Sequence, residues 1–372
     1  MRTRYPRRQH RMYKTLVKPA FFALDPERAH DLMRAAGRVA NNRPVSRMLR
    51  ALYDVWDSRL AVHVGGLSFP NPIGLAAGLD KQAELVGLMT GLGFGHLELG
   101  TVTAQPQPGN PKPRIFRLAA DNALINRMGF PSGGADALKH RLERIRRTFP
   151  ALPPIGINIG KSKATEIDQA IDDYCYSFKL LSPLADYVAV NVSSPNTQGL
   201  RQLQEKDRLK ALLLALRDAN TNKRPIWVKV APDLTWSAVD EVIECCLESG
   251  CTGIIATNTT LSREGHVTVI DQAGGLSGAP RRQKSLEMVR FIGARLAGRL
   301  GLIGVGGVST TDDVLAMLHA GASLVQVYTA LVYEGPALVK HLNRGLLAFM
   351  EQRGCRSVQE AALAWGEERR VA

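Results

Sequence analysis

The sequence Tyr187-Val-Ala-Val-Asn-Val-Ser-Ser-Pro-Asn-Thr197 joins an apolar run to a sudden cluster of amides and hydroxyls. Its first part has the β-branched character of a strand that is buried on both faces. Pro195 cannot donate a ladder hydrogen bond, so the strand must finish by Ser194. Asn191, Ser194 and Asn196 then lie where a parallel sheet opens to a ligand. The same residue types are common in turns, so taken alone the stretch also fits a simple capping loop.

This strand is one member of a regular alternation of strands and amphipathic segments. The candidate strands are residues 73–78, 96–102, 155–160, 187–192, 226–231, 253–257, 302–308 and 324–328. The amphipathic segments between them are residues 83–92, 135–148, 167–181, 207–219, 237–248, 284–296 and 312–319. Such an eightfold alternation predicts an α/β fold of the (β/α)8 TIM-barrel type. An open doubly wound sheet is the alternative, but Gly74-Leu-Ala-Ala-Gly78 lacks the expected GxGxxG spacing.

A small helical extension is expected before the barrel. Apolar stripes at helical spacing run through residues 16–24, 29–40 and 45–56, and Asp25-Pro26 supplies a cap and a first-turn proline. Residues 62–69 contain Gly65-Gly66 and predict a hairpin that closes the bottom of the barrel. We therefore divide the chain into a basic head with a helical module, residues 1–57, and a barrel, residues 58–372. From the apolar pattern alone a packing extension of the barrel is favoured, and it is the basic lead-in that favours a membrane-facing role.

Charge and composition narrow the function. The chain has 372 residues, 45% of them hydrophobic, and a net charge of +14. Much of that charge lies in the first 18 residues, which hold seven cations and no acid: Arg2, Arg4, Arg7, Arg8, Arg11, Lys14 and Lys18. We favour a lipid surface over nucleic acid, because the body has no zinc-finger or aromatic RNA-binding signature. A transit peptide is the alternative, although serine is not enriched.

Membrane-spanning, disulfide and metal signatures are missing from the sequence. No apolar run reaches the roughly 18 residues that a membrane span needs. The five cysteines are odd in number and form no CxxC pair, which favours a reducing compartment. Neither an HxH nor an HExxH motif occurs, so we expect no metal.

The strand ends of the expected barrel are rich in glycine, amides and hydroxyls. Gly304-Val-Gly-Gly307 and Tyr328-Thr329 suit the phosphate site that barrels often build after their last two strands. Lys229 lies inside an apolar strand, where an ammonium needs an anionic partner; a structural ion pair is the alternative to a ligand. Together these features indicate a barrel that binds flavin mononucleotide (FMN) and a flat anionic substrate.

Six motifs in order closely resemble the dihydroorotate dehydrogenase family over about residues 16–346. They are Ala76-Ala-Gly-Leu-Asp-Lys81, Asn126-Arg-Met-Gly-Phe130, Asn191-Val-Ser-Ser-Pro-Asn-Thr197, Ala256-Thr-Asn-Thr-Thr260, Gly274-Gly-Leu-Ser-Gly278 and Ile303-Gly-Val-Gly-Gly307. The resemblance implies an enzyme that oxidises dihydroorotate to orotate in pyrimidine synthesis, with one FMN per chain. In the soluble class the base is a cysteine, at the position that Ser194 occupies here. The chain therefore resembles the membrane-associated, quinone-reducing class, whose members carry a helical extension such as residues 12–57.

The resemblance also implies roles for particular residues. Ser194 would be the catalytic base, taking the C5 proton of dihydroorotate while the C6 hydride goes to the flavin; its own proton would need a relay, through Thr197 or water. FMN would be held by Ala76, Ala77, Gly78, Leu79, Asp80, Thr101, Asn158, Asn191, Lys229, Thr257, Gly278, Gly307, Tyr328 and Thr329. The substrate would meet Lys81, Asn126, Arg127, Met128, Gly129, Phe130, Asn191, Asn196, Asn258 and Thr259. His30 and Arg117 would line a quinone tunnel, although a solvated helix histidine is the alternative for His30.

We accordingly expect a peripheral protein on the cytoplasmic face of a bacterial inner membrane, or in the mitochondrial inner membrane as the alternative. It would act as a monomer and bind dihydroorotate, quinone and lipid, but no nucleic acid. Two rival functions remain open from the sequence. One is a nucleic-acid-binding barrel with a decayed flavin site, which a flavin spectrum would exclude. The other is a flavin barrel that reduces tRNA uracils or an enoate with NAD(P)H, which a substrate assay would identify.

Overall fold

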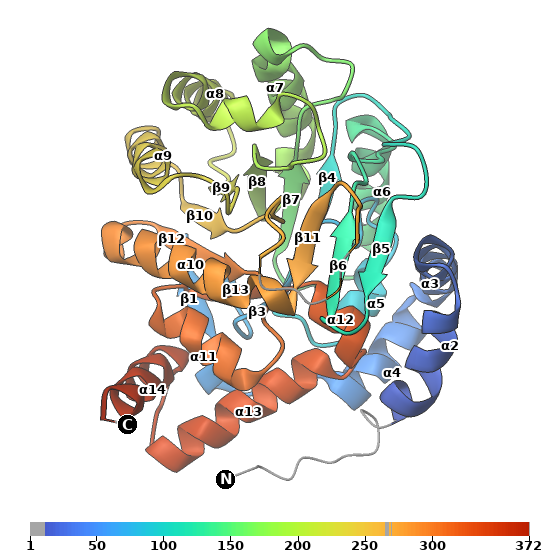
Figure 1. Cartoon of the computed structure of the whole chain (residues 1–372), viewed down its shortest axis with the longest axis vertical. Coiled ribbons are helices and arrows are strands. Elements are labelled where there is room, and N and C mark those ends of the chain that lie inside the picture. Colours follow the sequence, from blue (N-terminus) through green and yellow to red (C-terminus); the bar gives the residue numbers. More distant parts are fainter. Residues whose placement is uncertain (1–11, 265–267, 269, 372) are drawn as a thin grey trace.

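The computed structural model describes residues 12–264, 268 and 270–371, and its centre is a closed parallel barrel (Figure 1). The strands are β3 (Ile73–Leu75), β4 (His96–Val102), β7 (Ile155–Ile159), β8 (Tyr187–Asn191), β9 (Ile226–Val230), β10 (Gly253–Ala256), β12 (Gly301–Val305) and β13 (Leu324–Val327). They pair in this order around the ring, and β13 closes on β3. The eight strands predicted from the sequence are therefore confirmed, each within a few residues, as is the TIM-barrel fold.

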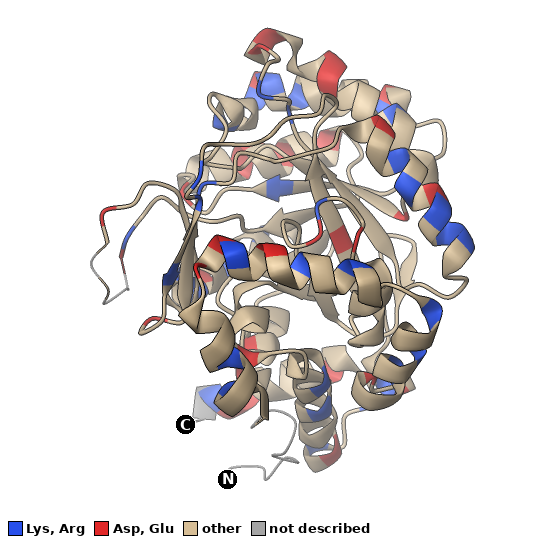
Figure 2. Cartoon of the chain, turned by 90° about the vertical axis from the view of Figure 1, so that its right-hand side faces the viewer, with Lys and Arg blue, Asp and Glu red and all other residues tan. Residues whose placement is uncertain are grey.

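Helices surround the barrel and carry its charged surface. They are α5 (Val86–Gly91), α6 (Ala135–Thr148), α7 (Ala170–Leu181), α8 (Lys206–Ala219), α9 (Trp236–Glu248), α10 (Arg282–Leu296) and α11 (Thr311–His319). Figure 2 shows most Lys, Arg, Asp and Glu on these outer helices and loops. The barrel strands are buried along almost their whole length, because helices cover them outside and side chains fill them inside.

A second, antiparallel sheet lies at the mouth of the barrel and was not predicted. It contains β5 (Ile115–Leu118), β6 (Ala123–Asn126) and β11 (Gly275–Gly278), in the order β11-β6-β5. A small core of Leu118, Ala123, Ile125 and Leu276 holds it together. In Figure 1 this sheet lies in front of the barrel strands, so it can roof a site at the mouth.

The opposite end of the barrel is closed by a hairpin, as predicted. Its strands are β1 (Val62–Val64) and β2 (Leu67–Phe69). Gly65 and Gly66 form the turn with φ of 61° and 74°, a left-handed conformation that glycine adopts without strain. A Cβ added at Gly65 would meet Thr252 at 2.5 Å, so this turn also packs closely on the barrel.

The N-terminal extension is helical and packs against the side of the barrel. A π-helical turn (Tyr13–Val17) leads into α2 (Lys18–Ala23), followed by α3 (Pro26–Ala40) and α4 (Arg43–Tyr53). The Asp25 side chain accepts hydrogen bonds from the backbone N–H groups of Glu27 and Arg28, which confirms the predicted cap. The arginines of the basic head at positions 2, 4, 7, 8 and 11 lie outside the described residues.

Three further helices follow the barrel: α12 (Thr329–Glu334), α13 (Leu338–Arg353) and α14 (Val358–Val371). The sequence pattern did not identify them. The first π-helical turn reaches α12, where the Tyr13 hydroxyl donates to the Val332 carbonyl at 2.7 Å and Lys14 pairs with Glu334 at 2.7 Å. Across the described part of the chain, no helix combines the length and the apolar character that crossing a membrane requires.

Candidate active site

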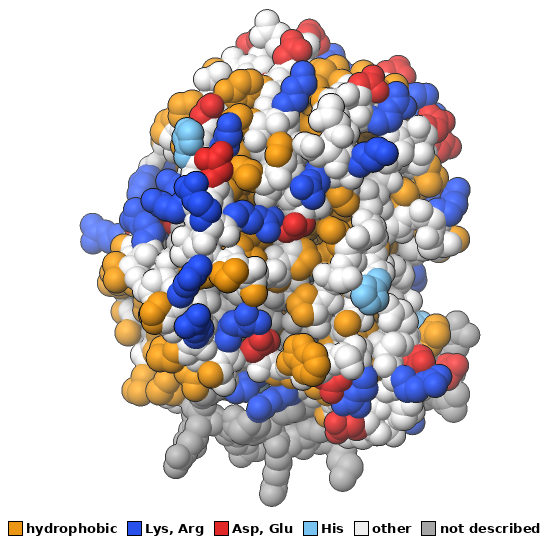
Figure 3. All heavy atoms as spheres, turned by 180° about the vertical axis from the view of Figure 1, so that it is seen from behind, with side chains coloured by type: hydrophobic (Ala, Val, Ile, Leu, Met, Phe, Trp, Pro, Cys, Tyr) orange, Lys and Arg blue, Asp and Glu red, His pale blue; other side chains and the backbone are white. Residues whose placement is uncertain are grey.

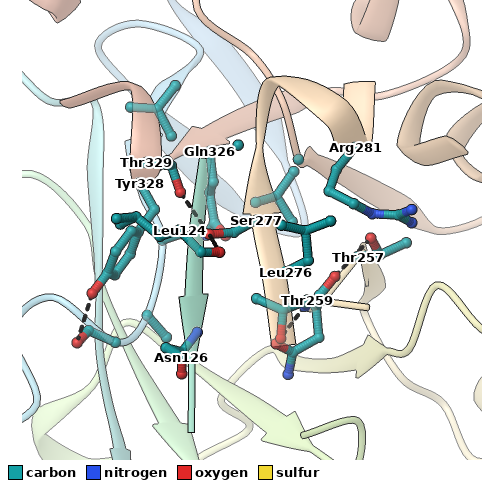
Figure 4. A pocket seen from close by; sticks show the side chains of 18 of the residues that line it. Leu124, Asn126, Thr257, Thr259, Leu276, Ser277, Arg281, Gln326, Tyr328 and Thr329 are labelled. Carbon is teal, nitrogen blue, oxygen red and sulfur yellow. Dashed lines mark hydrogen bonds between the residues drawn. The ribbon is translucent and has the colours of Figure 1, made fainter. Parts of the chain in front are cut away.

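A cavity of about 230 Å³ opens at the C-terminal mouth of the barrel, under the antiparallel sheet (Figure 4). Strand ends, the loops that follow them and the sheet itself contribute to its walls. Most residues predicted to hold FMN line it: Ala76, Ala77, Gly78, Thr101, Asn191, Lys229, Thr257, Gly278, Gly307, Tyr328 and Thr329. Most residues predicted to meet the substrate also do: Lys81, Asn126, Met128, Gly129, Phe130, Asn191, Asn196, Asn258 and Thr259, together with Ser194.

Three of the predicted FMN residues do not face this cavity. Asp80 is buried and accepts hydrogen bonds from the backbone N–H groups of Glu84 and Leu85, both at 2.8 Å, so it shapes the loop before α5. Burial raises the pKa of the Asp80 carboxyl, while those hydrogen bonds lower it. Leu79 lines a neighbouring polar cavity, and Asn158 lies one layer below the site.

Two predicted arginines also point away from the cavity. Arg127 stacks its guanidinium on Phe116 and donates to Gln272 at 2.8 Å, on the outer side of the roofing sheet. Arg117 donates to the carbonyls of Phe22 at 3.0 Å and Leu24 at 2.9 Å. Its place is therefore the junction between β5 and the N-terminal helices.

One part of the cavity wall combines a glycine pair, a helix N-terminus and unpaired donors. Gly306 and Gly307 have φ of 130° and 71°, and a Cβ at Gly307 would meet the Arg282 backbone at 2.5 Å. The start of α10 is thus pressed against this glycine pair, and helix N-termini favour anions. Arg281 Nη2 and Ser285 Oγ line the same cavity and are buried without a hydrogen-bond partner among the described residues. Buried donors of this kind fit an anionic ligand oxygen.

The floor of the cavity is a network of amides and hydroxyls. Asn191 Nδ2 donates to Thr101 Oγ1 at 2.9 Å, and Thr101 in turn donates to Asn158 Oδ1 at 2.5 Å. A bulge in β4 shifts the register between Gly100 and Val102, which is a common device for re-aiming a side chain beside a site. Tyr174 adds a hydrogen bond to the Asn191 carbonyl at 2.8 Å. The network fixes the polar edge that a bound ring would meet.

Lys229 lines the cavity from β9 and is paired from below. Its Nζ lies 3.0 Å from Oε1 of Glu98, and the two side chains are 5% and 0% exposed. Asn158 and Gln326 donate to the same carboxylate at 2.7 and 2.6 Å. The anionic partner that the sequence required for Lys229 is thus a residue of β4, and the lysine still reaches the cavity wall.

The predicted substrate residues that line the cavity are linked by hydrogen bonds between loops. Asn196 Nδ2 donates to the Asn126 carbonyl at 3.1 Å, which ties the loop after β8 to the roofing sheet. Asn258 Nδ2 donates to Ser193 Oγ at 3.0 Å. Lys81 hydrogen-bonds the Gly78 carbonyl, and burial, followed by Arg34 and Arg114, lowers the pKa of its ammonium to about 8. An anionic ligand would favour the charged form of this lysine.

Ser194 lies in the cavity wall and is 5% exposed. Its hydroxyl accepts a hydrogen bond from the backbone N–H of Asn196 at 3.3 Å. Within the described ranges, no carboxylate or imidazole hydrogen-bonds this hydroxyl. Thr197 Oγ1, three residues along, is buried without a partner in the same part of the chain. The loop therefore offers a second hydroxyl but no conventional base for activating Ser194.

His30 also lines the cavity, from α3 on its outer side. Burial, and next the positive charges of Lys81 and Arg34, lower the pKa of its imidazole to about 3. Tyr333 of α12 lines the same region and donates to the Ala123 carbonyl at 2.8 Å. The Lys18 ammonium lies over the rings of Phe22 and Tyr333, at 5.2 and 5.0 Å from their centroids. The helical extension thus contributes directly to one wall.

Several lining or supporting residues were not identified from the sequence: Glu98, Gln326, Ser277, Arg281, Ser285 and Tyr333. Glu98 could have been identified from the sequence, because a carboxylate inside an apolar strand is as unusual as the ammonium of Lys229. The described residues include no cluster of three or more His, Cys, Asp or Glu side chains that could hold a metal. All five cysteines are free thiols.

The fold and the cavity define a TIM-barrel protein with a polar site at the C-terminal mouth of the barrel. A family model described as dihydroorotate dehydrogenase matches residues 59–350. The chain therefore belongs to the dihydroorotate dehydrogenase family.

Curated relatives match over almost their whole length. A Gloeobacter violaceus protein named dihydroorotate dehydrogenase (quinone) is 49% identical over 346 residues, covering 93% of this chain and 97% of its own. One of the same name from Halobacterium salinarum is 48% identical over 348 residues, covering 93% and 98%. Among solved structures, the Eimeria tenella enzyme in complex with ferulenol superposes with a TM-score of 0.84 at 37% identity, covering 91% of this chain and 95% of the other.

Proposed function

We propose that this chain catalyses the FMN-dependent oxidation of (S)-dihydroorotate to orotate, with a membrane quinone as electron acceptor, in the de novo synthesis of pyrimidines. The observation that carries this proposal is the cavity itself: one lining holds a glycine pair with the unpaired donors of Arg281 and Ser285, the buried Lys229, and Ser194 together with Lys81 and several asparagines. The curated relatives named above carry quinone in their names, which supports the choice of acceptor.

The residues present fit FMN. Gly306 and Gly307 allow the start of α10 to pack tightly against this loop, and the unpaired Arg281 and Ser285 donors suit a phosphate. Thr101, Asn191 and Lys229 would hold the polar edge of the ring system. When bound, FMN supplies the hydride acceptor that none of the twenty side chains provides.

The chain's own residues would bind the substrate and move its proton. Lys81 would pair with the substrate carboxylate, and Asn126, Asn196 and Asn258 would hold the ring in one plane. Ser194 would accept the proton from C5 of dihydroorotate as general base. Because a serine hydroxyl is a weak base, it must pass its own proton on, and the buried hydroxyl of Thr197 or a water molecule would receive it.

The quinone would approach past the N-terminal extension. His30 and Tyr333 face the cavity from that side, and Arg117 anchors α2 through two backbone carbonyls. Nine of the thirteen exposed large hydrophobic residues of the described chain lie between positions 12 and 56, so this module has the most apolar surface. Figure 3 shows hydrophobic side chains gathered beside Lys and Arg over the same region, at the lower left. A peripheral site at a bilayer surface fits this combination, with the protein acting as a monomer.

Steady-state turnover with different acceptors tests the assignment. Purified protein should carry one FMN per chain and oxidise dihydroorotate with a ubiquinone or menaquinone analogue. Fumarate and NAD⁺ should give little turnover, because no site for either is proposed. Faster reduction of NAD⁺ than of quinone, or the absence of flavin, would refute the proposal.

A further inference from the structure

Glu98 is the most completely buried charge near the site, yet it does not touch the cavity. It lies in β4, is 0% exposed, and takes three donors from three other strands of the barrel: Lys229 of β9, Asn158 of β7 and Gln326 of β13. Lys229 and Gln326 line the cavity wall, whereas Glu98 is one layer below them. Glu98 can therefore influence a bound ligand only through the position and charge of Lys229 and Gln326.

The interior around the pair holds few other charges. His96 lies on the same strand and Tyr187 on β8, and the Gln326 amide lies 3.4 Å from His96 Nε2. Burial lowers the pKa of His96 to about 3 and raises that of Tyr187 well above its ordinary value, with the Glu98 charge as the second cause for Tyr187. Both groups are thus neutral between pH 6 and 9. Glu98 and Lys229 form the ion pair of this layer.

A buried ion pair of this kind has two effects on a ligand above it. First, it fixes the ammonium of Lys229, because the carboxylate holds Nζ at 3.0 Å and is itself held by two amides. Second, it offsets the lysine's positive charge. The electrostatic potential in the cavity is then that of a dipole instead of that of an isolated cation. In a medium of low dielectric constant, this difference strongly changes how well the site tolerates added electrons.

We propose that Glu98 is a positioning residue that fixes Lys229 against the cofactor and sets the reduction potential of the bound flavin. The inference rests on the proposed function only in assuming that FMN occupies the cavity. The carboxylate lowers the potential by neutralising part of the lysine's charge, and Lys229 raises it. The two residues of one pair thus act in opposite directions.

The test is the midpoint potential of purified, FMN-loaded variants, measured anaerobically against a reference dye from pH 6 to 9 with a chemical reductant. Glu98→Gln should shift the potential to more positive values at pH 6, because the Lys229 ammonium then lacks its compensating carboxylate. Lys229→Met should shift it to more negative values. The double variant, which lacks both charges, should fall between them. Lys161→Met, which removes a buried lysine outside the cavity, is the matched control and should leave the potential unchanged.

The result that would overturn the proposal is a Glu98→Gln potential equal to that of the native protein or shifted in the same direction as Lys229→Met. A merely structural role for Glu98 predicts one of these two outcomes. If Glu98→Gln does not fold, Glu98→Asp decides the question: the withdrawn carboxylate should give a smaller positive shift, and no shift or a negative one would refute the proposal. Because the reductant is chemical, dihydroorotate oxidation can fail separately: native protein that binds FMN but is not reduced by dihydroorotate would refute the proposed function alone.

Discussion

Arg114 Nη2 lies 2.6 Å from Oε1 of Glu27, and this buried ion pair joins the N-terminal extension to the barrel. The side chains are 11% and 6% exposed, and Arg114 Nε also donates to the same oxygen at 2.8 Å. Breaking a buried pair leaves an uncompensated charge. Glu27→Gln should therefore lower the free energy of unfolding by about 3 kcal/mol, measured by urea denaturation. A change below about 0.5 kcal/mol would show that the pair contributes no more than a surface ion pair.

The same contact affects how the extension can be tested. Deleting residues 1–57 would remove Glu27 and leave Arg114 without its carboxylate, so lost activity could reflect damage to the barrel. Substitutions on the exposed apolar surface avoid this problem, because they leave the Glu27–Arg114 pair in place. We therefore prefer surface variants of the full chain.

For membrane association, we expect the triple variant Leu32→Glu, Met48→Glu and Trp56→Glu to bind anionic liposomes much more weakly than the native protein. These side chains are 52%, 56% and 84% exposed. Cosedimentation measures binding, and it should also weaken with salt, since each Lys or Arg near anionic lipid adds about 1 kcal/mol.

The matched control for this variant is Leu363→Glu, because Leu363 is 65% exposed on α14, outside the extension. It should bind liposomes as the native protein does. Equal binding by the triple variant would show that the apolar surface of the extension is not the contact with lipid. Flavin content should be the same in all three proteins.

Ser194→Ala should slow the reduction of bound flavin by dihydroorotate by about 10² to 10⁴-fold, the usual cost of losing a general base. Reoxidation by quinone should be unchanged, because Ser194 takes no part in that half-reaction. Stopped-flow absorbance follows each half-reaction separately. Ser194→Cys should regain activity as pH rises, since a thiol ionises nearer neutrality.

Ser193→Ala gives the matched control for Ser194. Ser193 is the neighbouring hydroxyl, but it donates to Asn191 Oδ1 at 3.0 Å and does not line the cavity. Its loss should slow flavin reduction much less. Equal slowing by both variants, or slowing of both half-reactions by Ser194→Ala, would indicate damage to the loop instead of a lost base.

The lowered pKa of His30 predicts a pH dependence of stability. The native imidazole titrates at about 3, whereas an unfolded histidine titrates at 6.5. Between these values the unfolded chain binds a proton that the native protein does not, so stability falls as pH drops from about 6.5, by about 1.4 kcal/mol per pH unit for this group. Buried His96 acts in the same direction.

His30→Asn should remove part of this dependence. At pH 5 the number of protons taken up on unfolding should fall by about one, obtained from the slope of unfolding free energy against pH. Above about pH 7 the slopes of native and variant protein should agree. An unchanged slope at pH 5 would mean that His30 is protonated in the native state, which contradicts the lowering of its pKa by partial burial and by the charges of Lys81 and Arg34.

The barrel could be predicted because its strands are short apolar runs bounded by glycine and polar residues. The roofing sheet could not, since β5, β6 and β11 have only four residues each, and β11 pairs with β6 from a distant part of the chain. The sequence motifs identified which loops form the site, but not the direction in which each side chain points. Arg127 lies between Asn126 and Met128, yet its side chain turns outward to Gln272. The apolar strand around Lys229 indicated that this lysine needs an anionic partner. The identity of that partner could not be predicted, because only the folded barrel places Glu98 of β4 beside Lys229 of β9.

The most direct test of the account is the absorbance of the bound flavin when dihydroorotate is added without oxygen. We predict that the purified protein bleaches on adding one equivalent of (S)-dihydroorotate, releases one equivalent of orotate, and regains its colour when a quinone is added. Ser194→Ala should show the same change far more slowly. A flavin that stays oxidised with excess dihydroorotate, while a chemical reductant bleaches it, would contradict the central claim.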